Sequence, residues 1–514
     1  MLWARRVANA IIQSGVLTSA PLLAAATAAL LVFSYPSFNQ GYLAWLAFFP
    51  FGLLALESRS WKKSILAGYL AWLLLGLGVF YWIYPVCRAG GLSPAMSVAA
   101  WVALSALMAL EGALLGGIFF FLSRAGKWFP LAAACGVVTV DWLKAELLPA
   151  NFISFPWLLL GYTQWHYPLT IQMASVTGAV GLSFFISYPA LSLAFVTHDK
   201  WRNWKLPLAW PILSTLLLLG FGAKELLEAS KPQQGPTMRI SVLQPNIDQY
   251  RKWNSDYLQW IERRLNQQLP QAAIKNPQLV VWPEAAVPDW LDASYSSWIG
   301  ARASGMKAYQ LVGALMQDDG RSYVRAVLFN TDGNPSGFYT KQQLVPFGEY
   351  VPVRGLLERH IKILGKMGEF SPGPDNQTPL SIDGTPVGPL ICYESIFPAI
   401  ARKAAGNGAA VLVNLTNDGW YLDTAAPYQH FAANILRAVE NRKPLVRAAN
   451  TGISGWIDKW GRVREASELN TDCVMTFDIP LDRPEKTLYT SRGDLLAEMC
   501  LVILLPFLLV GLIM

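Results

Sequence analysis

The stretch Leu390-Ile391-Cys392-Tyr393-Glu394 ends a β-rich apolar run with a thiol followed closely by a carboxylate. Two stretches of the same kind precede it in the chain. Trp282-Pro283-Glu284 supplies a carboxylate, and Tyr339-Thr340-Lys341 supplies an ammonium group and leads into Leu344-Val345-Pro346-Phe347-Gly348-Glu349. A base, a cation and a nucleophile are the groups that acyl transfer through a covalent thioester requires. The three stretches together predict an acyl-transfer site.

The sequence around these stretches, from Lys224 to Asp494, is typical of a layered α/β domain, because short apolar strands alternate with helical patterns and Gly or Pro turns. The carboxyl ends of strands in such folds line the crevice where ligands bind, which is where the three stretches fall. We expect strands at Met238–Leu243, Gln278–Trp282, Gln310–Met316, Arg325–Asn330, Pro386–Cys392, Ala409–Asn414, Leu445–Ala449 and Val474–Phe477, and helices at Tyr257–Leu269, Pro288–Ala303, Phe397–Ala405 and Tyr428–Asn441.

The rest of the 514-residue chain is apolar enough to lie in a membrane. Hydrophobic residues make up 53% of the sequence, charged residues only 15%, and the mean hydropathy is +0.31. We therefore expect a transmembrane domain of seven helices at 1–223, a catalytic domain at 224–494 and a C-terminal transmembrane helix at 495–514. The eight expected spans are Leu17–Ser34, Gly41–Leu56, Ser64–Tyr84, Met96–Leu122, Leu131–Leu147, Gly178–Val196, Leu206–Ala223 and Leu495–Met514.

Basic residues predict the orientation, because they collect in cytoplasmic loops. Arg88 is the one basic residue in the loops of the opposite side. This distribution places both termini in the cytoplasm and the globular region on the opposite, outer side of the membrane. The first apolar stretch also fits a signal peptide, but the spans that follow at once favour an uncleaved anchor. The cytoplasmic basic residues are Arg5, Arg6, Arg59, Lys62, Lys63, Arg124, Lys127, Lys200, Arg202 and Lys205.

Charge, cysteine and histidine contents exclude several other classes of protein. The net charge of +7 is explained by the cytoplasmic loops, and no aromatic-plus-basic motif indicates nucleic acid. Five cysteines are too few for a disulfide framework, although a bridge between Cys87 and Cys473 stays possible. The four histidines lack the spacing of metal ligands, so we expect neither a metal nor another cofactor.

Cys392 and Glu284 each have a functional and a structural interpretation. A cysteine on an apolar strand is often a packing residue. At the start of a helix, however, its thiol can be ionised and can share an oxyanion hole with free backbone N–H groups. Glu284 could cap a following helix, or its apolar flanks could raise its pKa toward that of a general base.

Lys341, Glu349 and Glu394 have the same two interpretations. A lysine is usually a surface residue, but the apolar, turn-rich stretch after Lys341 suits a cleft wall, where an ammonium group stabilises an oxyanion. Glu349 and Glu394 could act directly, or they could be structural partners of Lys341 or Arg437. For Arg437 and Glu440, three residues apart on a predicted helix, we expect a simple salt bridge.

The three stretches resemble the Glu–Lys–Cys triad of the nitrilase, or carbon–nitrogen hydrolase, superfamily. With membrane spans on both sides, the chain is similar to one branch of it, the apolipoprotein N-acyltransferases. Asn417-Asp418-Gly419-Trp420 and Phe155-Pro156-Trp157 also resemble that branch. The resemblance implies an α-helical transmembrane bundle of eight spans that carries an α/β nitrilase-like domain, an αββα sandwich.

The resemblance also implies roles for individual residues. Glu284 would be the general base, Cys392 the nucleophile, and Lys341 the group that stabilises the tetrahedral intermediate. Supporting or substrate-side positions map onto Glu349, Glu394, Tyr393, whose backbone N–H would hold the oxyanion, Trp253, and Trp420 in a lipid-facing rim.

The implied reaction moves an acyl chain from a phospholipid donor in the bilayer, through the Cys392 thioester, to the N-terminal diacylglyceryl-cysteine of an apolipoprotein acceptor. The triad is equally compatible with a membrane-anchored amidase or nitrilase-type hydrolase. A transporter with an external binding domain is a third reading. We expect its candidate charges (Glu111, Asp141, Lys144 and Glu146) to face the bundle interior or the interface instead.

Overall fold

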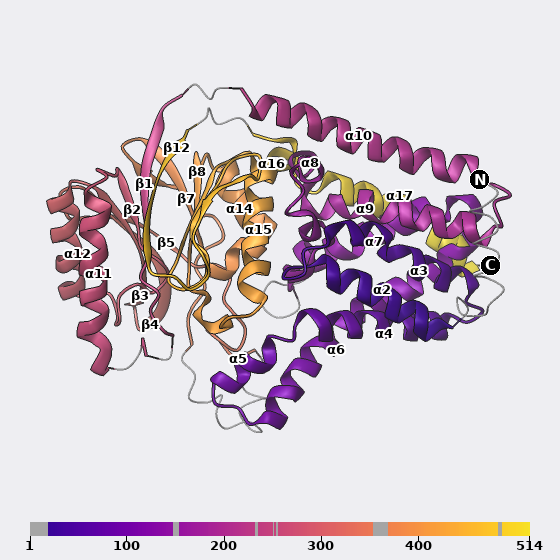
Figure 1. Ribbon diagram of the computed structural model, residues 1–514, viewed down its shortest axis with the longest axis horizontal. Helices are drawn as coiled ribbons and strands as arrows, with labels where there is room; N and C mark the ends of the chain where they lie inside the picture. The colour runs from indigo at the N-terminus through magenta and orange to yellow at the C-terminus, as the bar shows by residue number, and fades with distance from the viewer. Residues whose placement is uncertain are drawn as a thin grey trace.

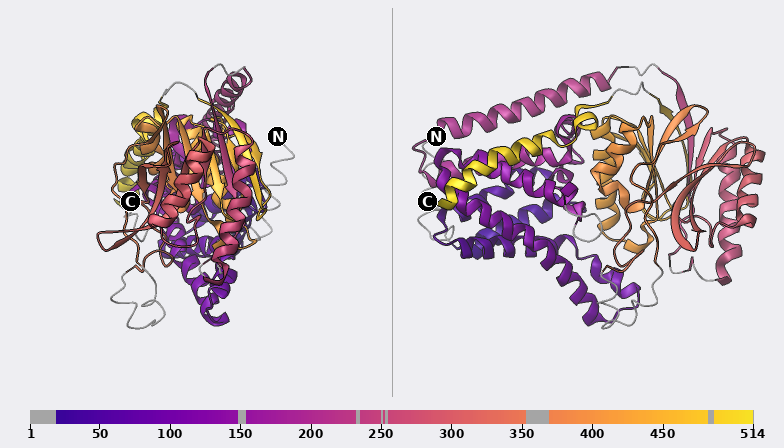
Figure 2. Two further views of the ribbon diagram at one scale, coloured as in Figure 1. Left: turned by 90° about the vertical axis from the view of Figure 1, so that its left-hand side faces the viewer. Right: turned by 180° about the vertical axis from the view of Figure 1, so that it is seen from behind.

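The structure, a computed structural model, describes residues 19–147, 154–231, 235–249, 251–252, 255–352, 369–481 and 486–513. It contains a bundle of helices and a part built on two β-sheets, which lie end to end (Figure 1). The last described helix, α17 (Leu495–Ile513), ends at the far end of the bundle, away from the sheets (Figure 2).

Each sheet has six strands. The first has the order β12-β1-β2-β3-β4-β5 and the second β11-β10-β9-β8-β7-β6. The strands of the first sheet are β1 (Thr237–Gln244), β2 (Leu279–Val281), β3 (Tyr309–Asp318), β4 (Arg321–Phe329), β5 (Pro335–Thr340) and β12 (Cys473–Pro480). Those of the second are β6 (Leu380–Ile382), β7 (Thr385–Ile391), β8 (Val411–Thr416), β9 (Leu445–Ala449), β10 (Gly455–Ile457) and β11 (Val463–Ala466).

Helices cover the outer face of each sheet and complete four αββα layers. Figure 1 shows α11 (Leu258–Ala273) and α12 (Ala293–Met306) outside the first sheet. The helices α14 (Pro398–Gly406) and α15 (Ala426–Asn441) cover the second sheet on the side of the bundle. The central strands β2, β8 and β9 are buried along their whole length, which explains their nearly continuous apolar sequences. The sandwich expected from the resemblance is therefore present.

Strand direction brings the predicted stretches together. β7 runs parallel to β8, so Cys392 and the segment after Thr416 leave the second sheet at the same side, where the carboxyl ends of both strands lie. In the first sheet β2 runs parallel to β3, while β3–β4 and β4–β5 are antiparallel. β5 therefore runs in the same direction as β2, so Glu284 and Lys341 also follow strands whose carboxyl ends lie at the same side of their sheet.

The bundle contains five described helices long and apolar enough to cross a membrane: Trp61–Val79, the continuous stretch Pro94–Glu146, Ala174–His198, Lys205–Ala229 and Leu495–Ile513. They indicate a membrane protein, but eight separate spans are not evident. Two expected spans merge in Pro94–Glu146, where Gly126 turns the backbone at φ 56°. Two others, α2 (Ala20–Ser34) and α3 (Ala44–Glu57), have 15 and 14 residues, fewer than the ~20 that cross a bilayer upright.

The remaining helices and helical turns belong to the bundle or connect elements of the sheet domain. The longer ones are α4 (Trp61–Val79), α6 (Pro94–Leu122), α7 (Phe129–Trp142), α9 (Ala174–His198), α10 (Lys205–Ala229) and α17 (Leu495–Ile513). The shorter helices and turns are η2 (Gly41–Leu43), α5 (Ile83–Ala89), η3 (Ser123–Trp128), η4 (Leu143–Leu147), η5 (Pro156–Leu158), η6 (Leu160–Gln164), α8 (Pro168–Ile171), η7 (Ser255–Tyr257), η9 (Cys392–Ile396), η10 (Asp418–Tyr421) and α16 (Leu488–Arg492).

Four strands, β5, β6, β10 and β11, are absent from the sequence prediction. β5 contains Pro335 and Gly337 and is largely exposed, and β11 is exposed throughout, so neither has a clear apolar pattern. The helix expected from Pro288 begins instead at Ala293, where the Asp292 carboxylate accepts a hydrogen bond from the Tyr295 N–H at 2.8 Å.

Candidate active site

Lys341 lies between two carboxylates. Its Nζ donates to Glu284 Oε1 at 2.9 Å and to Glu349 Oε1 at 2.6 Å, and its side chain is fully buried. Burial opposes the charging of Lys341, but Glu284 and Glu349 outweigh it and hold the pKa of this lysine well above its ordinary value. The ammonium group is therefore permanently charged, and Glu349 is its ion-pair partner, one of the two roles expected from the sequence.

The backbone fixes the position of Glu284. β2 ends at Val281, and Trp282-Pro283-Glu284 then crosses over Gly313 of β3. A methyl group on Gly313 would lie 2.4 Å from the Pro283 carbonyl oxygen and 2.6 Å from Glu284 Cα, so only glycine allows this approach. Lys252, fully buried, donates from Nζ to the main-chain oxygen of Glu284 at 3.3 Å. The side chain of Glu284 is 10% exposed.

Cys392 opens the 3-10 turn η9 directly after β7. Its φ is 51°, a left-handed conformation that is strained for a residue with a Cβ. The thiol is buried. Burial raises the pKa of this thiol, the charge of Glu284 raises it further, and Lys341 only partly opposes them. A raised pKa favours a thiol that is protonated rather than ionised at rest, so Cys392 needs a base to act as a nucleophile.

Glu394 joins the Cys392 turn to the Lys341 segment. Its carboxylate accepts hydrogen bonds from the N–H groups of Ile391 at 2.7 Å and Gln342 at 2.6 Å, and from the Tyr339 hydroxyl at 3.1 Å. The side chain is fully buried, and burial raises its pKa to about 7 against the opposing effect of these N–H groups. Among the described residues these hydrogen bonds join Glu394 to backbone groups and Tyr339 rather than to Lys341 or Arg437, so Glu394 is a bracket between the Cys392 turn and the Lys341 segment.

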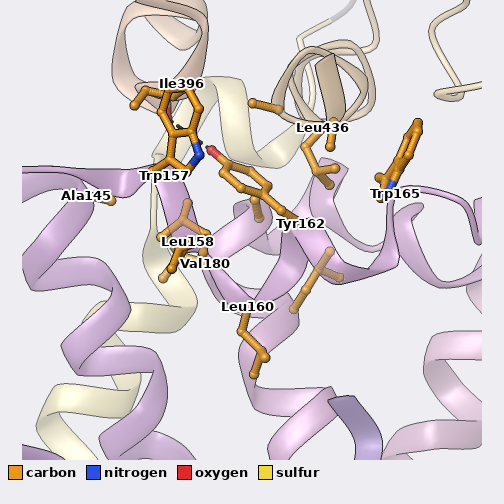
Figure 3. Packing of buried hydrophobic residues seen from close by; sticks show 14 of the residues in the cluster. Ala145, Trp157, Leu158, Leu160, Tyr162, Trp165, Val180, Ile396 and Leu436 are labelled. Carbon is orange, nitrogen blue, oxygen red and sulfur yellow. Dashed lines mark hydrogen bonds between the residues drawn. The ribbon is translucent and has the colours of Figure 1, made fainter. Parts of the chain in front are cut away.

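Tyr393 faces the helical bundle. Its ring stacks on Phe155 and Trp157, with centroids 6.3 and 6.4 Å away, and meets Phe397 edge to face. Figure 3 shows Trp157 and Tyr162 of the bundle reaching toward Ile396 and Leu436 of the sheet domain. The Tyr162 hydroxyl donates to the Ile396 carbonyl at 3.0 Å. Residues 155–162 therefore pack directly against the turn that contains Cys392.

The substrate-side residues differ in position. Trp420, in η10, is 47% exposed, whereas the next residue, Tyr421, packs edge to face on Trp82 and Trp157. Trp253 lies outside the described residues, so its expected role stays a prediction.

A buried polar network that the sequence did not predict lies behind Cys392. His430 Nε2 lies 3.0 Å from the Cys392 carbonyl oxygen, and Asn414 Nδ2 donates to the same oxygen at 3.3 Å. Asp418 Oδ1 lies 2.9 Å from His430 Nδ1, and Arg447 Nη2 donates to Asp418 Oδ2 at 2.6 Å. The available signal was Asp418 after a buried strand, followed by a lone histidine on the next helix.

Other predicted residues lie away from the site. Arg437 and Glu440 form a fully buried salt bridge at 2.8 Å, as expected. Lys144 Nζ pairs with Glu111 at 3.0 Å and with Asp141 at 3.1 Å inside the bundle, also as expected. Both Cys87 and Cys473 are free thiols, so the bridge between them is absent.

Two family models match the chain. Residues 239–488 match the carbon-nitrogen hydrolase family, and residues 27–192 match the apolipoprotein N-acyltransferase N-terminal domain. Together they span the sheet domain and most of the helical bundle.

Proteins from several bacteria are similar along almost their whole length. An apolipoprotein N-acyltransferase from Geobacter metallireducens is 34% identical over 495 residues, which cover 93% of this chain and 92% of that protein. One from Brucella melitensis is 31% identical and covers 86% and 81% of the two chains. The crystal structure of a carbon-nitrogen hydrolase from Helicobacter pylori G27 covers 53% of this chain and 94% of its own, with 18% identity and a TM-score of 0.37.

Proposed function

This chain belongs to the apolipoprotein N-acyltransferase family, and from that premise we propose that it moves an acyl chain from a phospholipid to the α-amino group of the diacylglyceryl-cysteine that begins an apolipoprotein. The observation that carries the proposal is the Lys341 ammonium held between Glu284 and Glu349, on a segment that the Glu394 carboxylate ties to the buried Cys392 turn. In the proposed reaction Glu284 is the base, Lys341 the cation and Cys392 the protonated nucleophile.

The first half-reaction forms an acyl-enzyme. Glu284 accepts the thiol proton as the Cys392 sulfur attacks the ester carbonyl carbon of the phospholipid. Lys341 and the backbone N–H of Tyr393 stabilise the negative charge on the carbonyl oxygen. The C–O bond of the ester then breaks, the leaving oxygen takes the proton from Glu284, and lysophospholipid departs.

The second half-reaction restores the thiol. The acceptor amine attacks the thioester carbonyl and gives a proton to Glu284. The C–S bond breaks, an amide forms, and the sulfur takes back the proton. Each substrate gains or loses one acyl group, so the cycle needs no oxidant, reductant or nucleotide.

The proposed arrangement in the cell follows from the basic loops. Residues 1–223 and 495–514 form the inner-membrane domain with eight spans, and residues 224–494 form the periplasmic catalytic domain, with both termini in the cytoplasm. Both substrates are lipids with reactive atoms near the headgroups. Extraction of an acyl chain into water would cost about 0.8 kcal/mol for each methylene, which a site at the bilayer surface avoids. Trp253 and Trp420 are the proposed substrate-side residues.

A radiolabelled phospholipid tests the nucleophile. Wild-type protein should form an acyl-enzyme that hydroxylamine cleaves, Cys392→Ala should form none, and Glu284→Gln should form it severely more slowly. Cys473→Ala, on the distant strand β12, is the matched control and should behave as wild type. Full transfer by Cys392→Ala would show that the thioester mechanism is wrong.

The acceptor is tested separately with a diacylglyceryl-cysteine peptide. Appearance of the N-acylated peptide, with loss of the label from the enzyme, is the expected result. Release of free fatty acid alone, at an unchanged rate with and without the peptide, would identify a membrane-anchored hydrolase instead.

A further inference from the structure

The backbone of Cys392 needs support from outside its own turn. A left-handed φ is strained for a residue with a Cβ, so the turn relaxes unless neighbours hold it. The Ile391 N–H on one side is held by Glu394. On the other side the Cys392 carbonyl oxygen accepts from Asn414 at 3.3 Å and faces His430 Nε2 at 3.0 Å. The shorter of the two contacts to this carbonyl is that of the histidine.

His430 is itself held from two sides. Asp418 Oδ1 lies 2.9 Å from Nδ1, and the Trp157 ring stacks on the imidazole with centroids 5.8 Å apart. The indole N–H of Trp157 donates to the side chain of Gln429, the residue before His430, at 2.6 Å. The ring is fully buried and cannot swing away from the Cys392 turn without breaking these contacts.

The chemistry of the neighbours indicates which nitrogen carries the proton. A carbonyl oxygen only accepts hydrogen bonds, so the contact with Cys392 calls for a proton on Nε2, and the Ser395 hydroxyl, 3.0 Å from the same nitrogen, can accept from it as well as donate to it. The Asp418 carboxylate beside Nδ1 also only accepts, but it already accepts from Arg447 Nη2 at 2.6 Å and from the Thr416 hydroxyl at 3.2 Å, and Nδ1 can accept from Arg447 Nη2 at 3.2 Å. Burial and the charge of Arg447 lower the pKa of His430, so the ring is neutral at pH 7 and has one proton to place.

We propose that His430 is a positioning residue for acyl transfer: its Nε2–H holds the Cys392 carbonyl, fixes the strained turn and so aims the thiol at Glu284 and the substrate ester. The inference rests on Cys392 being the nucleophile of the proposed function. Asp418, Arg447 and Trp157 orient the ring. Because Trp157 comes from the bundle, the aim of the nucleophile depends on how the membrane helices pack against the catalytic domain.

Two substitutions separate this role from simple packing. His430→Gln keeps an N–H donor near the position of Nε2 but removes the ring. His430→Phe keeps the ring and its stacking on Trp157 but removes the donor. If Nε2–H positions the turn, the His430→Gln variant should be acylated faster than the His430→Phe variant. If the ring only packs, the order should be reversed. His198→Gln and His198→Phe, at an exposed position at the end of α9, are the matched controls.

The measurement is single-turnover acylation by a labelled phospholipid in detergent micelles, which gives the amplitude and the rate constant separately. We expect His430→Phe to acylate about 10- to 100-fold more slowly at full amplitude, the cost of about 1 Å of misplacement or less, and His430→Gln to recover most of the rate. Equal rates for Phe and wild type, or a lower amplitude at an unchanged rate constant, would overturn the inference. If the His430→Phe variant does not fold, the His430→Gln variant alone tests the proposal. A folded His430→Gln variant that acylates about 100-fold more slowly than wild type would contradict the positioning role. Failure of wild type itself to label Cys392 would instead overturn the proposed function.

Discussion

Gly313→Ala should displace Glu284, the proposed base, without changing any of the proposed catalytic side chains. The added Cβ would lie 2.4 Å from the Pro283 carbonyl oxygen, 2.6 Å from Glu284 Cα and 3.0 Å from Glu284 N, all backbone atoms. Ordinary contact begins near 3.4 Å, so the Glu284 backbone must move by about 1 Å. A displacement of that size lengthens the 2.9 Å bond to Lys341 and takes the carboxylate away from the thiol. We expect acylation to slow by about 100-fold.

The assay is single-turnover formation of the hydroxylamine-sensitive acyl-enzyme. Stability should fall by only about 1–3 kcal/mol, the usual cost of overpacking, so the variant should remain folded in a denaturant titration. Gly305→Ala is the matched control, because a Cβ at that position of α12 meets nothing within 4 Å. A wild-type acylation rate in folded Gly313→Ala would refute the reasoning that this backbone contact sets the position of the base.

Three further predictions concern the triad and its bracket. Lys341→Met leaves Glu284 and Glu349 buried without their cation, so it should destabilise the protein by about 3–5 kcal/mol in chemical denaturation and abolish acylation; stability equal to wild type would contradict the ion-pair assignment. Since burial raises the pKa of the Cys392 thiol, the rate of its alkylation by iodoacetamide should still increase as the pH rises above the ordinary cysteine pKa of about 8.5. The Cys392→Ser variant gives the background from the other cysteines, and a rate that reaches a plateau below pH 8 would contradict the raised pKa. Glu394→Gln places an amide N–H against a backbone N–H, which should cost about 1.5–3 kcal/mol in stability and slow acylation at least tenfold; single-turnover kinetics at the wild-type rate would exclude a bracketing role.

The positions of Glu284 and Cys392 just after strands were predictable because buried strands have nearly unbroken apolar sequences that stop where the chain leaves the sheet, as β2 and β7 do. The strand before Lys341 was not predictable, because β5 is largely exposed and contains Pro335 and Gly337. Nor could the sequence assign the three stretches to one sheet or the other. The direct ion pair of Lys341 with Glu349 could be listed from the sequence only as one alternative.

The bracket and the buried network could not be predicted, because their partners are backbone groups brought close by loops. Glu394 accepts from the N–H of Gln342, 52 residues earlier, and no side-chain pattern marks a backbone donor. His430 meets the carbonyl of Cys392 across 38 residues. Likewise, the number of spans depends on the turn at Gly126, since hydropathy alone does not tell one bent helix from two.

Burial of the thiol explains how one site can favour an amine over water. A thiolate exposed at rest would react with any electrophile, and an exposed thioester would be hydrolysed before the acceptor arrived. In this site the thiol is buried, its pKa is raised, and Glu284, the proposed base, is held by Lys341. Deprotonation is therefore favourable only when an ester carbonyl is present to take the developing charge. The thioester formed at Cys392 would be shielded from water in the same way. An acceptor that is already dissolved in the lipid would therefore reach it most readily. Exposure of the Cys392 turn, as by loss of its contacts to Glu394 or His430, should consequently increase hydrolysis relative to amide formation as well as slow the chemistry.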